Sequence, residues 1–147
     1  MERGDADFAR FSQAWGELVS AVARARSRGA AAAEVELTFA QALLLEIVAG
    51  LEEPTVGEVA HAAGIASPSA TRMLQQLERK GMVVRRHPER DERVTVVTMT
   101  KAGGRALAEH RQRVGERLRE LFAGVEPGLR PLLVELLHDM RDAVNEM

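Results

Sequence analysis

The sequence predicts a mainly helical α+β fold, in which a central segment (residues 36–103) is flanked by helices in residues 1–35 and 104–147. Apolar residues recur at helical spacing over most of the chain. Two runs rich in valine and threonine, 82–86 and 94–99, flank a charged loop and predict one β-hairpin. A length of 147 residues suits a single domain with a substantial core.

Two long helices are predicted before the hairpin. The first, over residues 7–25, has its apolar residues at helical spacing. The second opens at a capping box formed by Thr38 and Gln41 and is apolar on nearly every side. A helix of that kind is buried in the middle of its domain. Gly50 and Pro54 mark its end.

Two shorter helices follow and predict a helix-turn-helix. Thr55 and Glu58 make a second capping box, and Gly64 ends this helix because glycine readily adopts positive φ. Ser67 is the predicted N-cap of the next helix, with proline at its first position. Gly81 is predicted to end that second helix.

The second of these helices has two unlike faces. Its apolar face should pack on the preceding helix. The opposite face and its margins lack carboxylates and carry groups that bond phosphates and base edges. The residues of this candidate DNA-binding surface are Ser67, Ser69, Thr71, Arg72, Gln75, Gln76 and Arg79. A face that is merely solvated is the alternative interpretation.

The hairpin adds arginines to the same segment. Arg85 and Arg86 in the first strand are candidates for contacts with the phosphate backbone. In the loop, Arg90 and Arg93 are candidates for a narrow minor groove, whose negative potential attracts guanidinium groups. Asp91 is expected to hold an arginine in position. Together these elements predict a winged helix-turn-helix, which places one helix in a DNA groove and a loop in the next.

The net charge of −2 is unevenly distributed. Residues 67–105 hold nine Lys and Arg against four Asp and Glu, a net charge of +5, whereas residues 1–66 carry −5 and residues 106–147 carry −2. Binding to DNA depends on the local field at the phosphates. The asymmetry therefore favours DNA as a partner, with an affinity that falls as salt rises.

A set of short motifs runs through this segment. The motifs are LTFAQ at 37–41, TVGEVA at 55–60, SPSATR at 67–72, LERKGMV at 77–83, DER at 91–93 and TMTKAG at 98–103. Over residues 36–108 the chain closely resembles the MarR family of bacterial transcription regulators. The resemblance implies major-groove contacts from Ser69, Thr71, Arg72 and Gln75. It also implies that Arg93 enters the minor groove and that Asp91 orients the wing.

The resemblance further implies a switch controlled by a small molecule. The family's usual pocket lies between the dimerisation helices and the winged domain. The residues expected to lie nearest to it here are Phe11, Trp15, Phe39, Leu43 and Met99. A small aromatic or lipophilic anion is the hypothesised effector. The alternative is that these five side chains belong to the core.

The helices at both ends carry more apolar surface than a small winged helix needs. A long helix is predicted over residues 101–122 and a final one over 129–144. We expect them, with the N-terminal helix, to be dimerisation helices that pack on the same helices of a second subunit. A two-fold dimer would place two DNA-reading helices about 34–36 Å apart, matching a pseudo-palindromic operator. A monomer whose terminal helices cover only its own core is the alternative.

Composition excludes several classes of protein and site. The absence of cysteine excludes disulfides, thiolate zinc sites and cysteine redox sensing. No catalytic set is evident and the four histidines lack metal-ligand spacing, so we expect neither an enzyme nor a metal site, although a metal shared across a dimer interface stays open. The sequence shows no signal peptide and no membrane-spanning run, which predicts a cytoplasmic protein.

The sequence therefore predicts a sequence-specific, DNA-binding transcription regulator. We expect a ligand-responsive repressor that binds its operator as a homodimer and needs no cofactor. Two alternatives stay open. One is a winged-helix module that binds partner proteins. The other is a constitutive DNA binder without an effector, whose signature would be little sequence preference and no response to ligands.

Overall fold

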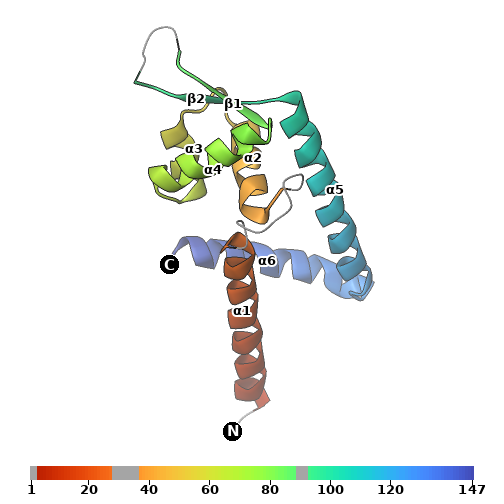
Figure 1. Cartoon of the computed structure of the whole chain (residues 1–147). Coiled ribbons are helices and arrows are strands. Elements are labelled where there is room, and N and C mark those ends of the chain that lie inside the picture. The colour runs from red at the N-terminus through yellow and green to blue at the C-terminus, as the bar shows by residue number, and fades with distance from the viewer. Residues whose placement is uncertain (1–2, 28–36, 89–92) are drawn as a thin grey trace. The chain divides into compact units, whose positions relative to one another are not determined.

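The computed structural model describes residues 3–27, 37–88 and 93–147. Its elements are, in chain order, α1 (Arg3–Ser27), α2 (Phe39–Gly50), α3 (Val56–Ala63), α4 (Ser67–Arg79), β1 (Val83–Arg86), β2 (Val96–Met99), α5 (Lys101–Ala123), the 3-10 helix η2 (Pro127–Leu129) and α6 (Arg130–Asn145) (Figure 1). This order confirms the predicted helical fold with one winged helix-turn-helix. The contacts divide the chain into two compact units, Met1–His110 and Arg111–Met147.

α1 is longer at both ends than the predicted 7–25. Asp5 lies in its first turn, and Arg24 and Arg26 lie in its last turn. Charges of these signs at these ends interact favourably with the helix dipole and so favour the extension by four residues at the start and two at the end. Across the described ranges, no helix combines the length and the hydrophobicity that crossing a membrane requires.

α2 forms the centre of the first unit, as its sequence predicts. Both halves of its capping box are present. The Gln41 amide donates to the Thr38 hydroxyl at 3.1 Å, and the Thr38 amide donates to Gln41 Oε1 at 3.2 Å. Leu44 and Leu45 are fully buried in the cluster that α2 shares with α3, α4, the hairpin and the start of α5. The box is local in sequence, whereas the burial depends on all of these neighbours.

The helix-turn-helix forms with one correction to its predicted caps. The Thr55 hydroxyl accepts the Glu58 amide at 3.1 Å, one half of the predicted box. The prediction of Ser67 as an N-cap is wrong, because the N-cap of α4 is Ala66, which makes no side-chain capping bond. The Ala66 carbonyl accepts the Ala70 amide at 3.1 Å, so helical bonding already begins one residue earlier.

A glycine ends α4 and turns the chain into the hairpin, as predicted. Gly81 has a φ of 73°, and its amide donates to the Glu78 carbonyl at 2.9 Å. The Met82 amide donates to the Leu77 carbonyl at 2.9 Å. These two bonds form a Schellman motif, and the buried side chains of Leu77 and Met82 pack in the same cluster.

The hairpin is shorter than its two predicted strands and is extended by a third segment. β1 and β2 pair antiparallel, from Val83 opposite Met99 to Arg86 opposite Val96. On the other edge of β2, Thr55 forms an isolated bridge with Val96. Two further backbone hydrogen bonds lie beside this bridge. The Val97 amide donates to the Pro54 carbonyl at 2.9 Å, and the Val56 amide donates to the Thr95 carbonyl at 3.1 Å. The loop that precedes α3 is thereby fixed to the hairpin.

The start of α5 is fixed against the end of α4 and the start of β1. The Thr100 hydroxyl donates to the Gly81 carbonyl at 2.6 Å and accepts the Gly103 amide at 3.1 Å. The Thr100 amide donates to the Met82 carbonyl at 3.0 Å. Gly103 is buried so tightly that an added Cβ would lie 2.1 Å from the Met82 carbonyl oxygen. Thr100 therefore caps the start of α5.

The second unit consists of the later turns of α5, η2 and α6. Arg130 lies over the Phe122 ring at 4.8 Å from its centroid and donates to the Val125 carbonyl at 3.1 Å. None of the residues of α6 is buried. Its large apolar side chains that are exposed in the single chain are Leu132, Val134, Leu136, Leu137 and Val144.

Candidate nucleic-acid interface

The structure separates the two faces of α4 as its helical periodicity predicts. Ala70, Leu74 and Leu77 are fully buried on one side. The candidate DNA-binding residues that are exposed are Ser67, Ser69, Arg72, Gln75 and Arg79. Thr71 and Gln76 are half-buried at the margins of this face. An exposed surface of arginine, glutamine and serine thus lies opposite the core-facing side of the helix.

Gln76 takes part in a contact inside the protein. Its Oε1 accepts from Gln41 Nε2 at 3.4 Å, and Lys80 Nζ donates to Gln41 Oε1 at 2.9 Å. Gln41 itself is buried at the start of α2. The sequence assigned Gln41 only a capping role, yet in the structure it also links α2 to the last turns of α4. The only sequence signal for this link is a polar residue within an apolar helix.

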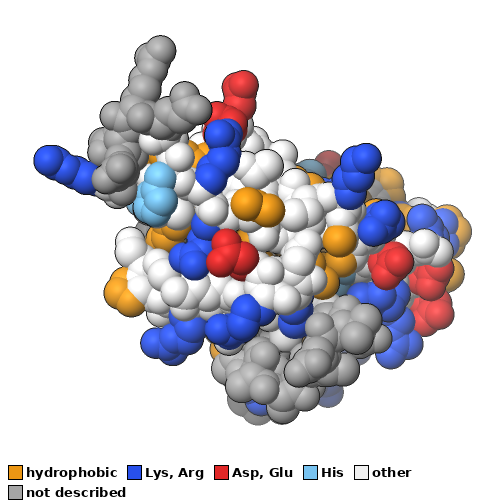
Figure 2. Space-filling view, turned by 45° about the horizontal axis from the view of Figure 1, so that its top comes forward, with side chains coloured by type: hydrophobic (Ala, Val, Ile, Leu, Met, Phe, Trp, Pro, Cys, Tyr) orange, Lys and Arg blue, Asp and Glu red, His pale blue; other side chains and the backbone are white. Residues whose placement is uncertain are grey.

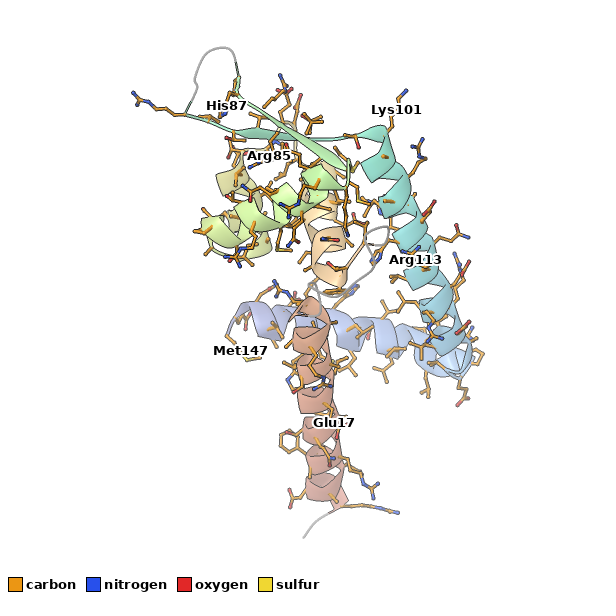
Figure 3. The ribbon with its side chains drawn as sticks, viewed as in Figure 1. Glu17, Arg85, His87, Lys101, Arg113 and Met147 are labelled. Atoms are coloured by element: carbon orange, nitrogen blue, oxygen red, sulfur yellow. The ribbon has the colours of Figure 1, made fainter. Side chains whose placement is uncertain are left out.

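Arg85 is held by a carboxylate of α4. Its amide donates to Glu78 Oε2 at 3.1 Å, and its Nη2 donates to Glu78 Oε1 at 3.2 Å. The guanidinium of Arg85, and then its backbone amide, lower the pKa of Glu78 below the usual 4.5. The sequence predicted that Arg85 contacts phosphates, whereas this contact joins β1 to α4. Figure 3 labels Arg85 on β1.

Replacing Glu78 with glutamine should make the free energy of unfolding less dependent on pH in acidic solution. A carboxyl whose pKa is lowered by folding adds stability above its unfolded pKa, and this stability is lost as pH falls through the lower folded value. Because the pair is partly exposed, we expect Glu78→Gln to cost about 1 kcal/mol or less at about pH 7. The difference in stability between this variant and the wild type should become smaller at pH values below 4.5.

Urea unfolding at several pH values measures this difference. Glu109→Gln is the control, because it removes an exposed carboxylate from α5. A Glu78→Gln cost that is unchanged between neutral and acidic solution would contradict the ionic role of Glu78.

Arg86 pairs with a different acid. Its guanidinium donates to the carboxylate of Glu53, which lies in the loop between α2 and α3. Both side chains are more than half exposed. The sequence offered no signal for this pair, because its members are separated by 33 positions.

The loop of the wing is described only at its two ends. Arg90 and Asp91 lie outside the described residues. Arg93 is described and exposed. His87 Nδ1 lies 3.1 Å from the Val94 carbonyl oxygen and bridges the two sides of the loop. Figure 2 shows basic side chains around much of the face that carries the hairpin, with a few acidic ones among them.

The five residues predicted to surround an effector have different surroundings in the structure. Phe11 and Phe39 are exposed, Trp15 is half-buried, and Met99 packs on the core beside Gly103. Leu43 lines a cavity of about 110 Å³. The other residues that line it are Arg26, Ala40, Leu44, Ala63, Ile65 and Met73. This cavity therefore has one basic side chain in an otherwise apolar wall.

Comparison with known proteins agrees with the geometry of the winged helix. Residues 36–94 match the model of the MarR family, and this segment runs from the linker before α2 into the wing. The winged helix-turn-helix segment of this chain thus matches the MarR family. The chain is 32% identical over 104 residues to YdgJ, an uncharacterized HTH-type transcriptional regulator of Bacillus subtilis. The matched part covers 71% of this chain but only 63% of the length of YdgJ.

Two solved structures of transcription regulators resemble this chain. The transcriptional repressor CouR, bound to a 23-mer DNA duplex, has 25% identity and a TM-score of 0.68, over 87% of this chain and 89% of its own. BpsR of Bordetella bronchiseptica, whose DNA binding is regulated by 6-hydroxynicotinic acid, has 25% identity and a TM-score of 0.62. That likeness covers 88% of this chain and 98% of BpsR.

Proposed function

We propose that this protein is a sequence-specific DNA-binding transcription regulator. It acts as a homodimeric, ligand-responsive repressor on a pseudo-palindromic operator. The exposed surface of α4 carries this proposal, because it presents Arg72, Gln75 and Arg79 on a helix whose other side is fully buried. Arginine and glutamine are side chains that bond base edges in the major groove. The DNA duplex bound to the similar repressor CouR supports the same assignment.

The apolar surface of the second unit supports a homodimer. A groove of about 360 Å³ runs between the later part of α5 and α6. It is lined by Leu118, Arg119, Leu121, Phe122, Val125, Leu133 and Leu137. Leu121 is 72% exposed and Leu118 is 59% exposed in the single chain. A contiguous apolar surface of this kind is typical of a protein–protein contact, and a second copy of the chain would cover it.

The cavity lined by Leu43 supports a small-molecule effector. Arg26 supplies a positive charge for an anion, and the remaining wall is apolar. Met73 belongs to α4, so a molecule bound in the cavity would touch the helix proposed to contact DNA. A small aromatic or lipophilic anion is the effector class that we propose. The regulation of BpsR by 6-hydroxynicotinic acid is consistent with this class.

Thermal melts with a panel of aromatic carboxylic acids test the effector. A ligand present well above its Kd should raise the melting temperature of the wild type, and Arg26→Ala should reduce this shift. If no acid changes the melting temperature, the effector proposal loses its support.

Selection of DNA by the purified protein tests the main proposal. The protein is mixed with random duplexes at near-physiological salt, and the bound fraction is sequenced. We expect enrichment of an inverted repeat whose half-sites lie about one helical turn apart. Bound but unenriched duplexes would indicate the constitutive binder without sequence preference. Absence of binding would favour the protein-interaction module.

Replacing Arg72 with alanine should weaken binding to the selected operator. A bidentate contact between arginine and guanine contributes about 1–3 kcal/mol of discrimination, so we expect a loss of affinity of about fivefold to 150-fold. Arg113→Ala is the control, because it makes the same change in charge at an exposed position of the second unit. Equal losses of operator affinity in the two variants would show that Arg72 makes no specific contact with the operator.

A further inference from the structure

The two consecutive arginines at the end of β1 are paired in different ways. Arg85 uses its backbone amide and its guanidinium to contact Glu78, and its side chain is 24% exposed. Arg86 contacts Glu53 with its guanidinium, and these side chains are 52% and 63% exposed. Solvent and ions therefore reach the Arg86–Glu53 pair more readily than the Arg85–Glu78 pair.

The backbone of the preceding loop places Glu53 beside the hairpin. In the hairpin register Arg86 lies opposite Val96, and Thr55 bridges to Val96 from the other edge of β2. The Pro54 carbonyl accepts the Val97 amide at 2.9 Å. Glu53 therefore directly precedes a segment that is bonded to β2, and its own φ of 42° turns the chain there. Its carboxylate is positioned by backbone contacts and not only by the attraction of Arg86.

We propose that Glu53 withholds Arg86 from DNA phosphates and thereby lowers the affinity of the winged helix for duplex DNA of any sequence. This inference rests on the proposed DNA-binding function. A phosphate presents anionic oxygens to a guanidinium just as a carboxylate does, so it can replace Glu53 as the partner of Arg86. The exposed pair contributes little free energy, and its exchange for a phosphate is correspondingly easy.

The adjacent pair should not exchange in this way. For Arg85 the exchange would break the guanidinium hydrogen bond to Glu78, a carboxylate that the Arg85 backbone amide also holds in place. Arg86 would lose only its contact with Glu53, and its strand pairing would be unaffected. Because phosphate contacts carry no sequence information directly, the exchange changes the sequence-independent part of the affinity.

The test compares two adjacent glutamates. Glu53→Gln keeps the size of the side chain and removes the charge that holds Arg86. We expect its affinity for a labelled duplex of random sequence to rise about threefold at near-physiological salt, which is within the range of exposed ion pairs. Glu52→Gln makes the same change in net charge at the neighbouring exposed position. It should raise the affinity by less than half of the increase that Glu53→Gln causes.

A double-mutant cycle identifies the residue that gains the contact. When Arg86→Ala is combined with Glu53→Gln, the gain in affinity should disappear. The loss of affinity caused by Arg86→Ala should be smaller in the wild-type background than in the Glu53→Gln background. Equal affinities of Glu53→Gln and Glu52→Gln would overturn the inference, as would a gain that persists without Arg86. If the wild type binds no duplex, the proposed function itself fails. A wild type that binds while Glu53→Gln behaves like Glu52→Gln refutes only the role of Glu53.

Discussion

A Gly103→Ala variant should be strongly destabilised. The added methyl group would lie 2.1 Å from the Met82 carbonyl oxygen and 2.9 Å from Met99 Cγ. The methionine side chain can move, but the Met82 carbonyl is fixed because it accepts the Thr100 amide at 3.0 Å. Relief therefore requires the first turn of α5 to move away from the start of β1. We expect a loss of about 3 kcal/mol of unfolding free energy, at the upper end of the usual cost of overpacking.

The neighbouring glycine provides a matched control for this variant. Around Gly104, the nearest atom to an added Cβ is Met99 Cε at 3.9 Å, an ordinary contact distance. Alanine is favoured over glycine inside a helix by about 0.5–1 kcal/mol, so Gly104→Ala should be neutral or stabilising. Urea unfolding of both variants measures the difference. Equal stabilities would show that α5 does not need its close contact with Met82.

A Leu121→Glu variant should be monomeric and should lose most of its operator affinity. Leu121 is largely exposed in the single chain and lines the groove between α5 and α6. A glutamate there would place an unpaired charge in the proposed dimer interface, which is costly to bury. The two halves of the operator would then be bound separately, and we expect the affinity to fall about a hundredfold or more.

Sedimentation and operator titration measure the two parts of this prediction. Leu51→Glu is the control, because it makes the same chemical change at an exposed leucine of the first unit. It should stay dimeric. A Leu121→Glu variant that sediments as a dimer would show that another surface joins the subunits.

The sequence was sufficient for features that depend on neighbouring residues. The Thr38–Gln41 box and the turn at Gly81 involve positions three or four apart or a single backbone angle, and the structure has both. The start of α4 was less predictable. Serine before proline is typical of an N-cap, but Ala66 takes that place because Ser67 already has helical geometry. Serine at that position thus belongs to the helix itself.

The partners of the polar side chains in the candidate interface could not be predicted from periodicity. A helical wheel places Gln76 at the margin of the exposed face of α4, but it does not show that Gln41, 35 positions away, is within reach. The same holds for Arg86 and Glu53, which are brought together by the pairing of β2 with two other segments. Sequence spacing identified which side chains bear charge, and only the tertiary fold determines which of them are already paired.

The half-buried Trp15 of α1 gives this protein an unusual optical property. It is the single tryptophan, and the chain has no tyrosine. Intrinsic fluorescence excited in the near ultraviolet therefore originates from one indole ring on the N-terminal helix, while α2 to α6 and the hairpin contribute almost no emission. The emission maximum reports the polarity around α1 alone. Dilution of the protein would shift that maximum if α1 is buried between subunits, without any added label.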